Sequence, residues 1–313
     1  MEFRPLGKSG LQVSVVGLGC NNFGMRTDAE GTRAVVAKAL DEGVNLFDTA
    51  DVYGGRGKSE ELLAKALGNR RKDIIVATKF GSPMGDAPHM RGGSRRHIMD
   101  AVDDSLKRLG TDYIDLYQIH FPDPSTPEEE TLETLDSLVR SGKVRYLGNS
   151  NYAGWQVAEA SWISKSHGWA AYISAQNQYN LLDRRVEREL VPACEHYGLG
   201  ILPYFPLASG FLTGKYKRGA DPAKDTRLGM MRQMADRVLN DENFDKLEKL
   251  DSFAKSHGHS MVELATSWLA CQPQVSSVIS GATRPEQVTE NVKAAGWKMT
   301  RDELGEIDKI AKR

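Results

Sequence analysis

The chain has 313 residues and a formal net charge of -1, with 41 Lys and Arg residues against 42 Asp and Glu residues. This balance excludes the basic excess that binding to nucleic acid or to an anionic membrane requires, so we expect a small-molecule partner. The three cysteines lie far apart without metal-ligand spacing, which indicates free thiols in a reducing compartment. The apolar stretch at residues 13–20 is too short and too interrupted for a signal peptide or a membrane span, so we expect a cytoplasmic protein.

The chain begins with a predicted hairpin and continues with repeated strand–helix units. Residues 3–13 are expected to form a β-hairpin that turns at residues 7–10, Gly-Lys-Ser-Gly, and to plug the bottom of the sheet. Apolar, β-rich runs then alternate with helical segments, whose apolar residues recur three and four positions apart. The predicted helices include residues 28–40, 94–109 and 127–140, and the predicted strands are residues 15–19, 45–49, 74–79, 114–120, 144–150, 172–176, 200–203 and 275–279.

Eight strands of this kind favour a (β/α)8 TIM barrel, because an open doubly wound sheet usually stops at about five to seven strands. No tract rich in Pro, Ser or Gly divides the chain, so we expect one domain over residues 1–313. Residues 210–240 are mostly polar, and they predict a long loop after the seventh strand, on the face where barrel active sites lie.

Four polar side chains stand at the ends of consecutive predicted strands. Asp48 and Tyr53 follow the second strand, Lys79 ends the third, and His120 ends the fourth. Each alone has a simpler explanation, as a turn former, a packing residue, a solvated cation or a structural histidine. Adjacent strands lie about 4.8 Å apart, so we expect the four side chains to form one cluster.

Such a cluster suits proton transfer to a carbonyl oxygen. At an effective dielectric constant of about 20, an ammonium about 4 Å from a phenol is worth about 4 kcal/mol, which predicts a pKa of about 7 for Tyr53. Asp48 is expected to hold Lys79 by a charge-assisted hydrogen bond, and His120 to orient the carbonyl oxygen. The cluster contains no reductant, so a reductase of this design takes hydride from a cofactor. A Schiff-base lyase that uses Lys79 is an alternative, although Asp48 would keep Lys79 charged.

With these motifs in view, the chain resembles the aldo-keto reductase superfamily along essentially its whole length. It is most similar to bacterial members that themselves resemble the potassium-channel β-subunits. The resemblance rests on Asp48-Thr49-Ala50 leading to Tyr53, Ala77-Thr78-Lys79, Gln118-Ile119-His120, Gly148-Asn149-Ser150-Asn151, Gln176-Asn177-Gln178-Tyr179-Asn180, Tyr204-Phe205-Pro206-Leu207, and Ser280-Gly281-Ala282-Thr283-Arg284-Pro285-Glu286-Gln287 running to Glu290-Asn291.

The resemblance implies an NADPH-dependent oxidoreductase that reversibly reduces an aldehyde or ketone, with Tyr53 as general acid/base in a tetrad of Asp48, Tyr53, Lys79 and His120. It also implies a cofactor extended across the barrel mouth, without a Rossmann domain. Ser150, Asn151 and Gln176 fall on the positions that bind the nicotinamide carboxamide, and Tyr204 falls on the aromatic that stacks on its ring. The full set of expected cofactor contacts is Gly19, Asn21, Asp48, Ser150, Asn151, Gln176, Tyr204, Phe205, Pro206, Leu207, Ser209, Gly210, Leu212, Lys215, Gly281, Thr283, Arg284, Gln287 and Asn291.

The phosphorylated cofactor is favoured over NADH. Arg284 begins the last predicted helix, whose N-terminus already favours anions. No acidic residue stands between Ser280 and Pro285 to bind a free ribose 2′-hydroxyl. Gly281 and Ala282 replace a polar pair of the better-known branch of the superfamily, which places more of the 2′-phosphate recognition on Arg284.

The substrate pocket is predicted to include Phe23, Tyr53, Met84, His120 and Phe121, which indicates an apolar wall. Its loops vary freely on this fold, so the sequence predicts neither a particular carbonyl substrate nor an oligomeric state. No metal site is expected, because the His257–His259 pair lacks a carboxylate or thiolate at ligand spacing. A regulatory binding subunit, similar to the channel β-subunits, is the alternative function.

Overall fold

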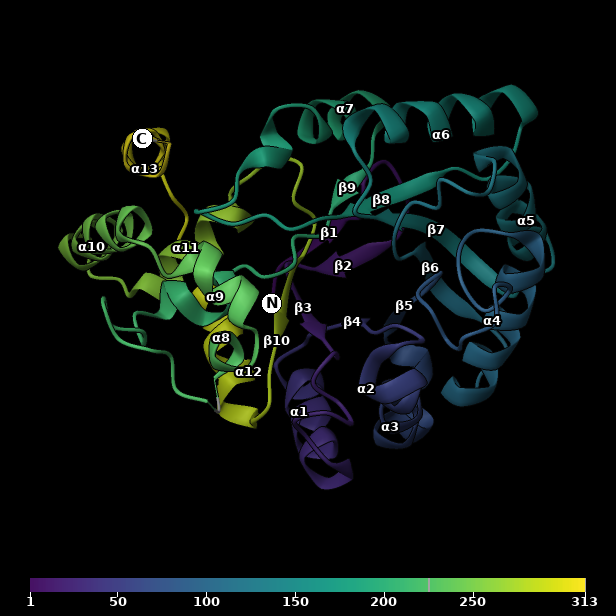
Figure 1. The fold of residues 1–313 in the computed structure, drawn as a ribbon, viewed down its shortest axis with the longest axis horizontal. Helices are drawn as coiled ribbons and strands as arrows, with labels where there is room; N and C mark the ends of the chain where they lie inside the picture. Colours follow the sequence, from purple (N-terminus) through teal and green to yellow (C-terminus); the bar gives the residue numbers. More distant parts are fainter. Residues whose placement is uncertain (225, 313) are drawn as a thin grey trace.

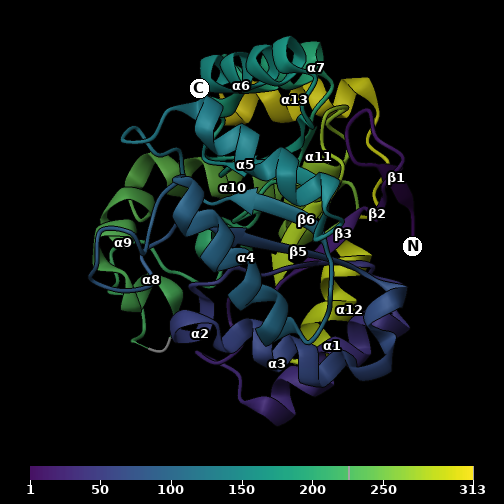
Figure 2. The same ribbon diagram turned by 90° about the vertical axis from the view of Figure 1, so that its right-hand side faces the viewer.

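The computed structural model describes residues 1–224 and 226–312. In this part of the chain, eight parallel strands form one curled sheet in the order β10-β3-β4-β5-β6-β7-β8-β9, and helices cover its outer face (Figures 1 and 2). The predicted (β/α)8 barrel is therefore confirmed. The strands are β3 (Val16–Gly19), β4 (Leu46–Asp48), β5 (Ile75–Phe80), β6 (Ile114–Ile119), β7 (Val144–Ser150), β8 (Tyr172–Gln176), β9 (Gly200–Ile201) and β10 (Val278–Gly281).

Helices connect the successive strands, because parallel strands need crossover connections between them. Side chains cap two of these helices at their N-termini, since those of Asp28 and Ser94 accept backbone hydrogen bonds from Gly31 and His97. The helices are α1 (Ala29–Asp41), α2 (Tyr53–Arg56), α3 (Lys58–Leu67), α4 (Arg95–Leu109), α5 (Glu128–Arg140), α6 (Gly154–His167), α7 (Leu190–Tyr197), α8 (Arg227–Met230), α9 (Arg232–Val238), α10 (Asp241–Ser256), α11 (Met261–Ala270), α12 (Pro285–Ala294) and α13 (Arg301–Ala311).

Backbone hydrogen bonds between the two ends of the sheet close the barrel. The Ile201 N–H donates to the Gln274 carbonyl at 2.7 Å, and the Ile279 N–H donates to the Pro203 carbonyl at 3.0 Å. The last strand lies later than predicted, at Val278–Gly281, because residues 274–276 bond to β9 and parallel pairing with β3 starts only at Val278.

The N-terminal hairpin closes the bottom of the barrel, as predicted. Its strands, β1 (Phe3–Pro5) and β2 (Gln12–Ser14), pair antiparallel. Leu6 and Val13 are fully buried and pack inside the barrel against residues such as Leu46 and Ile75. The turn demands glycine at its start, since Gly7 has a φ of +58° and an added Cβ would lie 2.5 Å from the Gly198 carbonyl oxygen.

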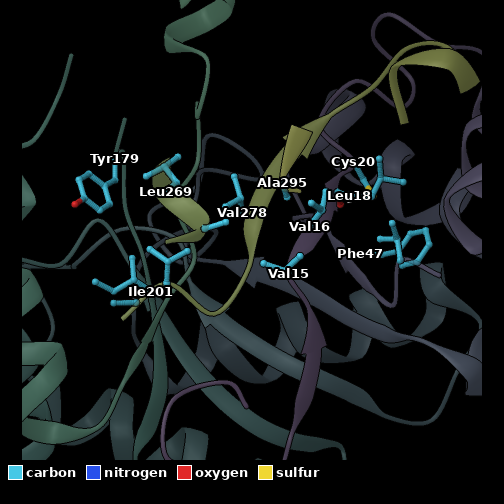
Figure 3. Close-up of a cluster of buried hydrophobic side chains, with 14 of the residues drawn as sticks. Val15, Val16, Leu18, Cys20, Phe47, Tyr179, Ile201, Leu269, Val278 and Ala295 are labelled. Carbon is cyan, nitrogen blue, oxygen red and sulfur yellow. Dashed lines mark hydrogen bonds between the residues drawn. The ribbon is translucent and has the colours of Figure 1, made fainter. Parts of the chain in front are cut away.

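A larger apolar core lies between the sheet and the helices. Figure 3 shows part of it, where β3 and β10 bring Val16 and Val278 together with Leu269 of α11. Burying this surface rigidly fixes the strands, and with them the residues at their carboxyl ends. Among the described residues, no helix combines the length and the apolar character needed to cross a bilayer.

The segment at residues 210–240 was expected to be a long loop, and much of it is helical. It contains the end of a 3-10 turn at Ala208–Thr213, then α8 and α9. The Thr226 side chain caps α8 by accepting from the Gly229 N–H. Asp225 lies outside the described residues. The segment follows β9, so it lies at the carboxyl end of the strands, as predicted.

Candidate active site

The strand ends bring Asp48, Tyr53, Lys79 and His120 to one place. Asp48 ends β4, Tyr53 begins α2, Lys79 is the last residue but one of β5, and His120 directly follows β6. All three strands are parallel neighbours in the sheet, so their carboxyl ends meet at one edge.

Asp48 and Lys79 form a buried ion pair in which both groups have further partners. The Lys79 Nζ lies 2.6 Å from Oδ2 of Asp48 and donates to the Thr49 carbonyl at 2.8 Å. The other carboxylate oxygen, Oδ1, accepts from the side-chain amides of Gln176 at 2.8 Å and Gln118 at 3.1 Å. Burial opposes the charge on Lys79, but Asp48 and Tyr53 outweigh it, so the pKa of Lys79 is raised. A lysine held charged in this way is a poor nucleophile, which disfavours the Schiff-base alternative.

Tyr53 lies against both cationic and aromatic neighbours. The Lys79 Nζ is 5.1 Å from the centre of its ring, and the His120 ring approaches edge-on at 5.6 Å. Burial raises the pKa of Tyr53; the charge of Lys79 lowers it, and that of Asp48 raises it again, with a net increase. The predicted pKa of about 7 is therefore wrong, because it counted Lys79 but neither burial nor Asp48. At neutral pH Tyr53 is a protonated phenol, which is the form that can donate a proton.

His120 is neutral and is held on two sides. Burial, together with the charge of Lys79, lowers the pKa of His120 to about 3. Its Nδ1 lies 3.1 Å from the Ser82 hydroxyl, and its ring stacks on the Phe121 ring with the centres 4.9 Å apart. A neutral imidazole carries one N–H, so His120 can donate a single hydrogen bond to a bound oxygen.

A cavity of about 570 Å³ opens over these side chains. Asp48, Tyr53, His120 and Phe121 lie in its wall, with Lys79 fully buried beneath. Most of the predicted cofactor contacts also line it, namely Gly19, Asn21, Asp48, Ser150, Asn151, Gln176, Tyr204, Phe205, Pro206, Leu207, Ser209, Gly210, Lys215, Gly281, Thr283, Gln287 and Asn291.

Two of the predicted cofactor contacts, Leu212 and Arg284, lie outside the wall of this cavity. Leu212 is fully buried in the apolar core, and Arg284 is the exposed residue that precedes α12.

Two predicted pocket residues also lie elsewhere. Phe23 is fully buried, because the turn that follows it folds its ring into the apolar core. Met84 faces a second cavity of about 350 Å³, which it shares with Asp51 and residues of α4. Of the three apolar residues expected in this wall, Phe121 therefore remains, and side chains from the loops at the barrel mouth accompany it.

Further side chains of the cavity wall come from the loops that cover the barrel mouth. Arg227 lies with its guanidinium 4.4 Å from the centre of the Phe205 ring, and Arg26, Met231 and Met234 line the same cavity. A weak signal was available, since an arginine and several methionines stand in a segment already expected on this face. The places of Arg227, Met231 and Met234 depend on α8 and α9, which the residue pattern did not predict.

The cavity wall includes strained backbone and a network of amides. Asn151, Phe205 and Ser209 in this wall have positive φ values of 62°, 54° and 59°, and the adjacent Ala208 has one of 46°. The Asn151 amide donates to the His120 carbonyl at 2.9 Å and accepts from the Tyr204 hydroxyl at 2.7 Å. Strain of this kind persists only where the surrounding structure fixes it, and it concentrates at ligand sites.

These residues fit an extended, anionic dinucleotide. Amide groups lie near the tetrad, where a carboxamide needs donors and acceptors, and Lys215 and Arg227 add positive charge to the same wall. Gly210 has a φ of +88°, a backbone conformation that other residues rarely adopt, so a glycine is favoured at this point of the wall. Among the described residues, no group of three or more His, Cys, Asp or Glu side chains is placed to hold a metal ion.

Comparison with known proteins agrees with this geometry. The model of the Aldo/keto reductase family matches residues 15–312. The "Probable voltage-gated potassium channel subunit beta" of Oryza sativa subsp. japonica is 40% identical over 301 residues, which cover 94% of this chain and 91% of that protein. The "L-glyceraldehyde 3-phosphate reductase" of Escherichia coli O157:H7 is 36% identical, with 98% and 92% covered. The "Versiconal hemiacetal acetate reductase" of Aspergillus parasiticus is 34% identical, with 97% and 95% covered.

The chain belongs to the aldo/keto reductase family. The resemblance found in the sequence motifs is thereby confirmed, including the similarity to channel β-subunits. The relatives include proteins named as reductases and proteins named as channel subunits, so family membership gives an oxidoreductase framework without selecting the substrate.

Proposed function

We propose that the protein is an NADPH-dependent reductase of aldehydes or ketones. The observation that carries this proposal is the protonated phenol of Tyr53 beside the charged Lys79, at a cavity of about 570 Å³ that most of the predicted cofactor contacts line. Lys79 stabilises the phenolate that forms when Tyr53 gives up its proton, and Asp48 keeps Lys79 in place. His120 donates a hydrogen bond to the carbonyl oxygen, which polarises the carbonyl.

A bound NADPH supplies the hydride. Asn151, Ser150 and Gln176 are the side chains proposed to hold its carboxamide, with Tyr204 against its ring. The reverse reaction, alcohol oxidation, needs Tyr53 as a phenolate. Since the pKa of Tyr53 is raised, alcohol oxidation is expected to require alkaline pH, whereas reduction proceeds at neutral pH.

We also propose that the protein prefers NADPH over NADH. Arg284 at the start of α12 supports it, because a guanidinium at a helix N-terminus suits a 2′-phosphate. Glu290, in the wall of the same cavity, is a carboxylate that suits a free ribose hydroxyl better than a phosphate, and so opposes this preference. We also propose a cytoplasmic location, which suits the free thiols of Cys20, Cys194 and Cys271.

The experiment compares the wild type with Tyr53→Phe, using NADPH and then NADH as reductant and 4-nitrobenzaldehyde as a reactive carbonyl. Loss of the phenolic proton is expected to lower kcat about 10²- to 10⁴-fold. The Kd of NADPH, measured by its fluorescence, is expected to stay unchanged. Equal turnover in the variant would overturn the assignment of Tyr53, and failure of both cofactors to bind would overturn the cofactor proposal.

A regulatory subunit is the second candidate, favoured by the similarity to proteins named as channel β-subunits. The same experiment separates the two. A protein that binds NADPH tightly and turns over no aldehyde would support the regulatory function.

A further inference from the structure

The hydrogen bond between Ser82 and His120 has a direction that the surroundings determine. Ser82 follows β5 by two residues and is 6% exposed. In the described part of the chain, its hydroxyl has one hydrogen bond, to Nδ1 of His120 at 3.1 Å. The serine also lies outside the walls of both cavities, so the hydroxyl has no second acceptor there.

Two arrangements of the protons satisfy this contact, and they differ in what they leave unpaired. If Nδ1–H donated to the serine oxygen, the serine O–H would be buried without an acceptor, which costs about 1–3 kcal/mol. If the serine O–H donates to Nδ1, every proton in the pair has a partner, and the imidazole proton is on Nε2. The second arrangement is therefore the stable one.

The free nitrogen of His120 faces the cavity. His120 lies in the cavity wall, and Nε2 has no hydrogen bond to the described residues. In this part of the chain, Nε2 of His97 is a buried polar atom without a hydrogen-bond partner, whereas Nε2 of His120 is not buried in this way. Nε2 is thus accessible from the cavity, beside the Tyr53 ring.

We propose that Ser82 is a positioning residue that donates its hydroxyl hydrogen bond to Nδ1 of His120 and so keeps the imidazole proton on Nε2, where it can bind a substrate carbonyl oxygen. This inference rests on the proposed reductase function. The low pKa of His120 supports it, because a histidine that stays neutral has one N–H to place, and the wrong tautomer would present a lone pair to the carbonyl oxygen.

The test uses a matched pair of substitutions. Ser82→Thr keeps the hydroxyl, and Ser82→Val has almost the same shape without it. We expect Ser82→Val to lower kcat about tenfold, less than the roughly 10²- to 10³-fold cost of deleting a donor to the reacting oxygen. We expect Ser82→Thr to retain wild-type kcat, and both variants to bind NADPH as the wild type does.

Nitrogen NMR of ¹⁵N-histidine-labelled protein reads the tautomer directly, whatever the activity. His120 is assigned by comparison with His120→Gln. We expect a protonated Nε2 and a bare Nδ1 in the wild type and in Ser82→Thr, and a mixture of tautomers in Ser82→Val.

A protonated Nδ1 in the wild type would overturn the proposal, as would Ser82→Val with both tautomer and kcat unchanged. Should Ser82→Val not fold, Ser82→Ala replaces it. The NMR result stands even if no carbonyl is reduced, so failure of this inference and failure of the proposed function are distinguishable.

Discussion

Asp48 and Asp51 are two buried carboxyl groups three positions apart, and they differ in their hydrogen-bond partners. Asp48 accepts hydrogen bonds on both oxygens, from Lys79 on one and from Gln118 and Gln176 on the other. In the described structure, neither carboxyl oxygen of Asp51 has a hydrogen-bond partner of good geometry.

The electrostatic result follows from these partners. Burial, reinforced by the charge of Glu60, raises the pKa of Asp51 to about 8, so Asp51 is largely uncharged at neutral pH. The ammonium of Lys79 is instead matched by the Asp48 carboxylate in the site itself. Burial alone does not decide whether an aspartate is charged, because partners within hydrogen-bond distance offset the loss of water.

Replacing each of the two carboxyl groups by an amide tests whether Asp48 and Asp51 differ in function. Asp48→Asn leaves the buried Lys79 ammonium without its counter-ion, which is expected to cost about 3–5 kcal/mol of folding free energy. It is also expected to lower kcat about 10²-fold or more, since Lys79 is no longer held against Tyr53. Asp51→Asn is expected to leave kcat unchanged.

Urea unfolding and aldehyde reduction, measured on the same preparations, check both expectations. NADPH binding by each variant shows whether the site has kept its shape. If Asp51→Asn lost activity as severely as Asp48→Asn, the distinction drawn between the two carboxyl groups would fail.

The same contrast separates what the sequence could predict from what it could not. Strand ends follow from the alternation of β-rich runs and helices, and parallel strands end at one edge, so Asp48, Lys79 and His120 could be brought together from residue order. The barrel and the bottom hairpin could be predicted for the same reason.

Properties that depend on how deeply a side chain is buried, or on how loops pack, could not be predicted from the sequence. The pKa of Tyr53 depends on burial by the whole barrel mouth, which no local pattern contains. Phe23 and Met84 stand in loops near the site in sequence, but their turns direct one into the core and the other toward a second cavity. Arg227 reaches the site because α8 forms inside a segment that reads as a polar loop.

The raised pKa of Asp51 predicts that the folding stability of the wild type depends on pH in a way that Asp51→Asn removes. A carboxyl group whose pKa is raised from about 4 in the unfolded chain to about 8 in the folded protein contributes stability below about pH 4, and that contribution is lost as the pH rises through about 8. Asp51→Asn has no such loss. The stability of the variant relative to the wild type is therefore expected to increase over this range, by at most about 1.4 kcal/mol per pH unit.

Urea unfolding at about pH 5 and about pH 8 measures this difference. Asp104→Asn is the matched control for the substitution itself, because Asp104 is an exposed carboxyl that lines the same second cavity as Asp51. A difference between Asp51→Asn and the wild type that stayed constant with pH would mean that Asp51 is ionised in the folded protein over this range, and would overturn the raised pKa.

The smallest expected effect concerns the partners that distinguish Asp48 from Asp51. Gln118 is fully buried, lies outside the cavity wall, and donates to Asp48 alone among the tetrad residues. Gln118→Leu removes a hydrogen bond to a charged group, worth about 1.5–3 kcal/mol, and kcat is expected to fall about tenfold with the Kd of NADPH unchanged.

Gln176 donates to the same oxygen but also lines the cavity, so Gln176→Leu is expected to weaken NADPH binding as well as turnover. Comparing Gln118→Leu with Gln176→Leu therefore distinguishes a residue that only supports the tetrad from one that also contacts the cofactor. If Gln118→Leu changed NADPH affinity and left kcat alone, Asp48 would not depend on its amide donors, and the difference from Asp51 would have to come from Lys79 alone.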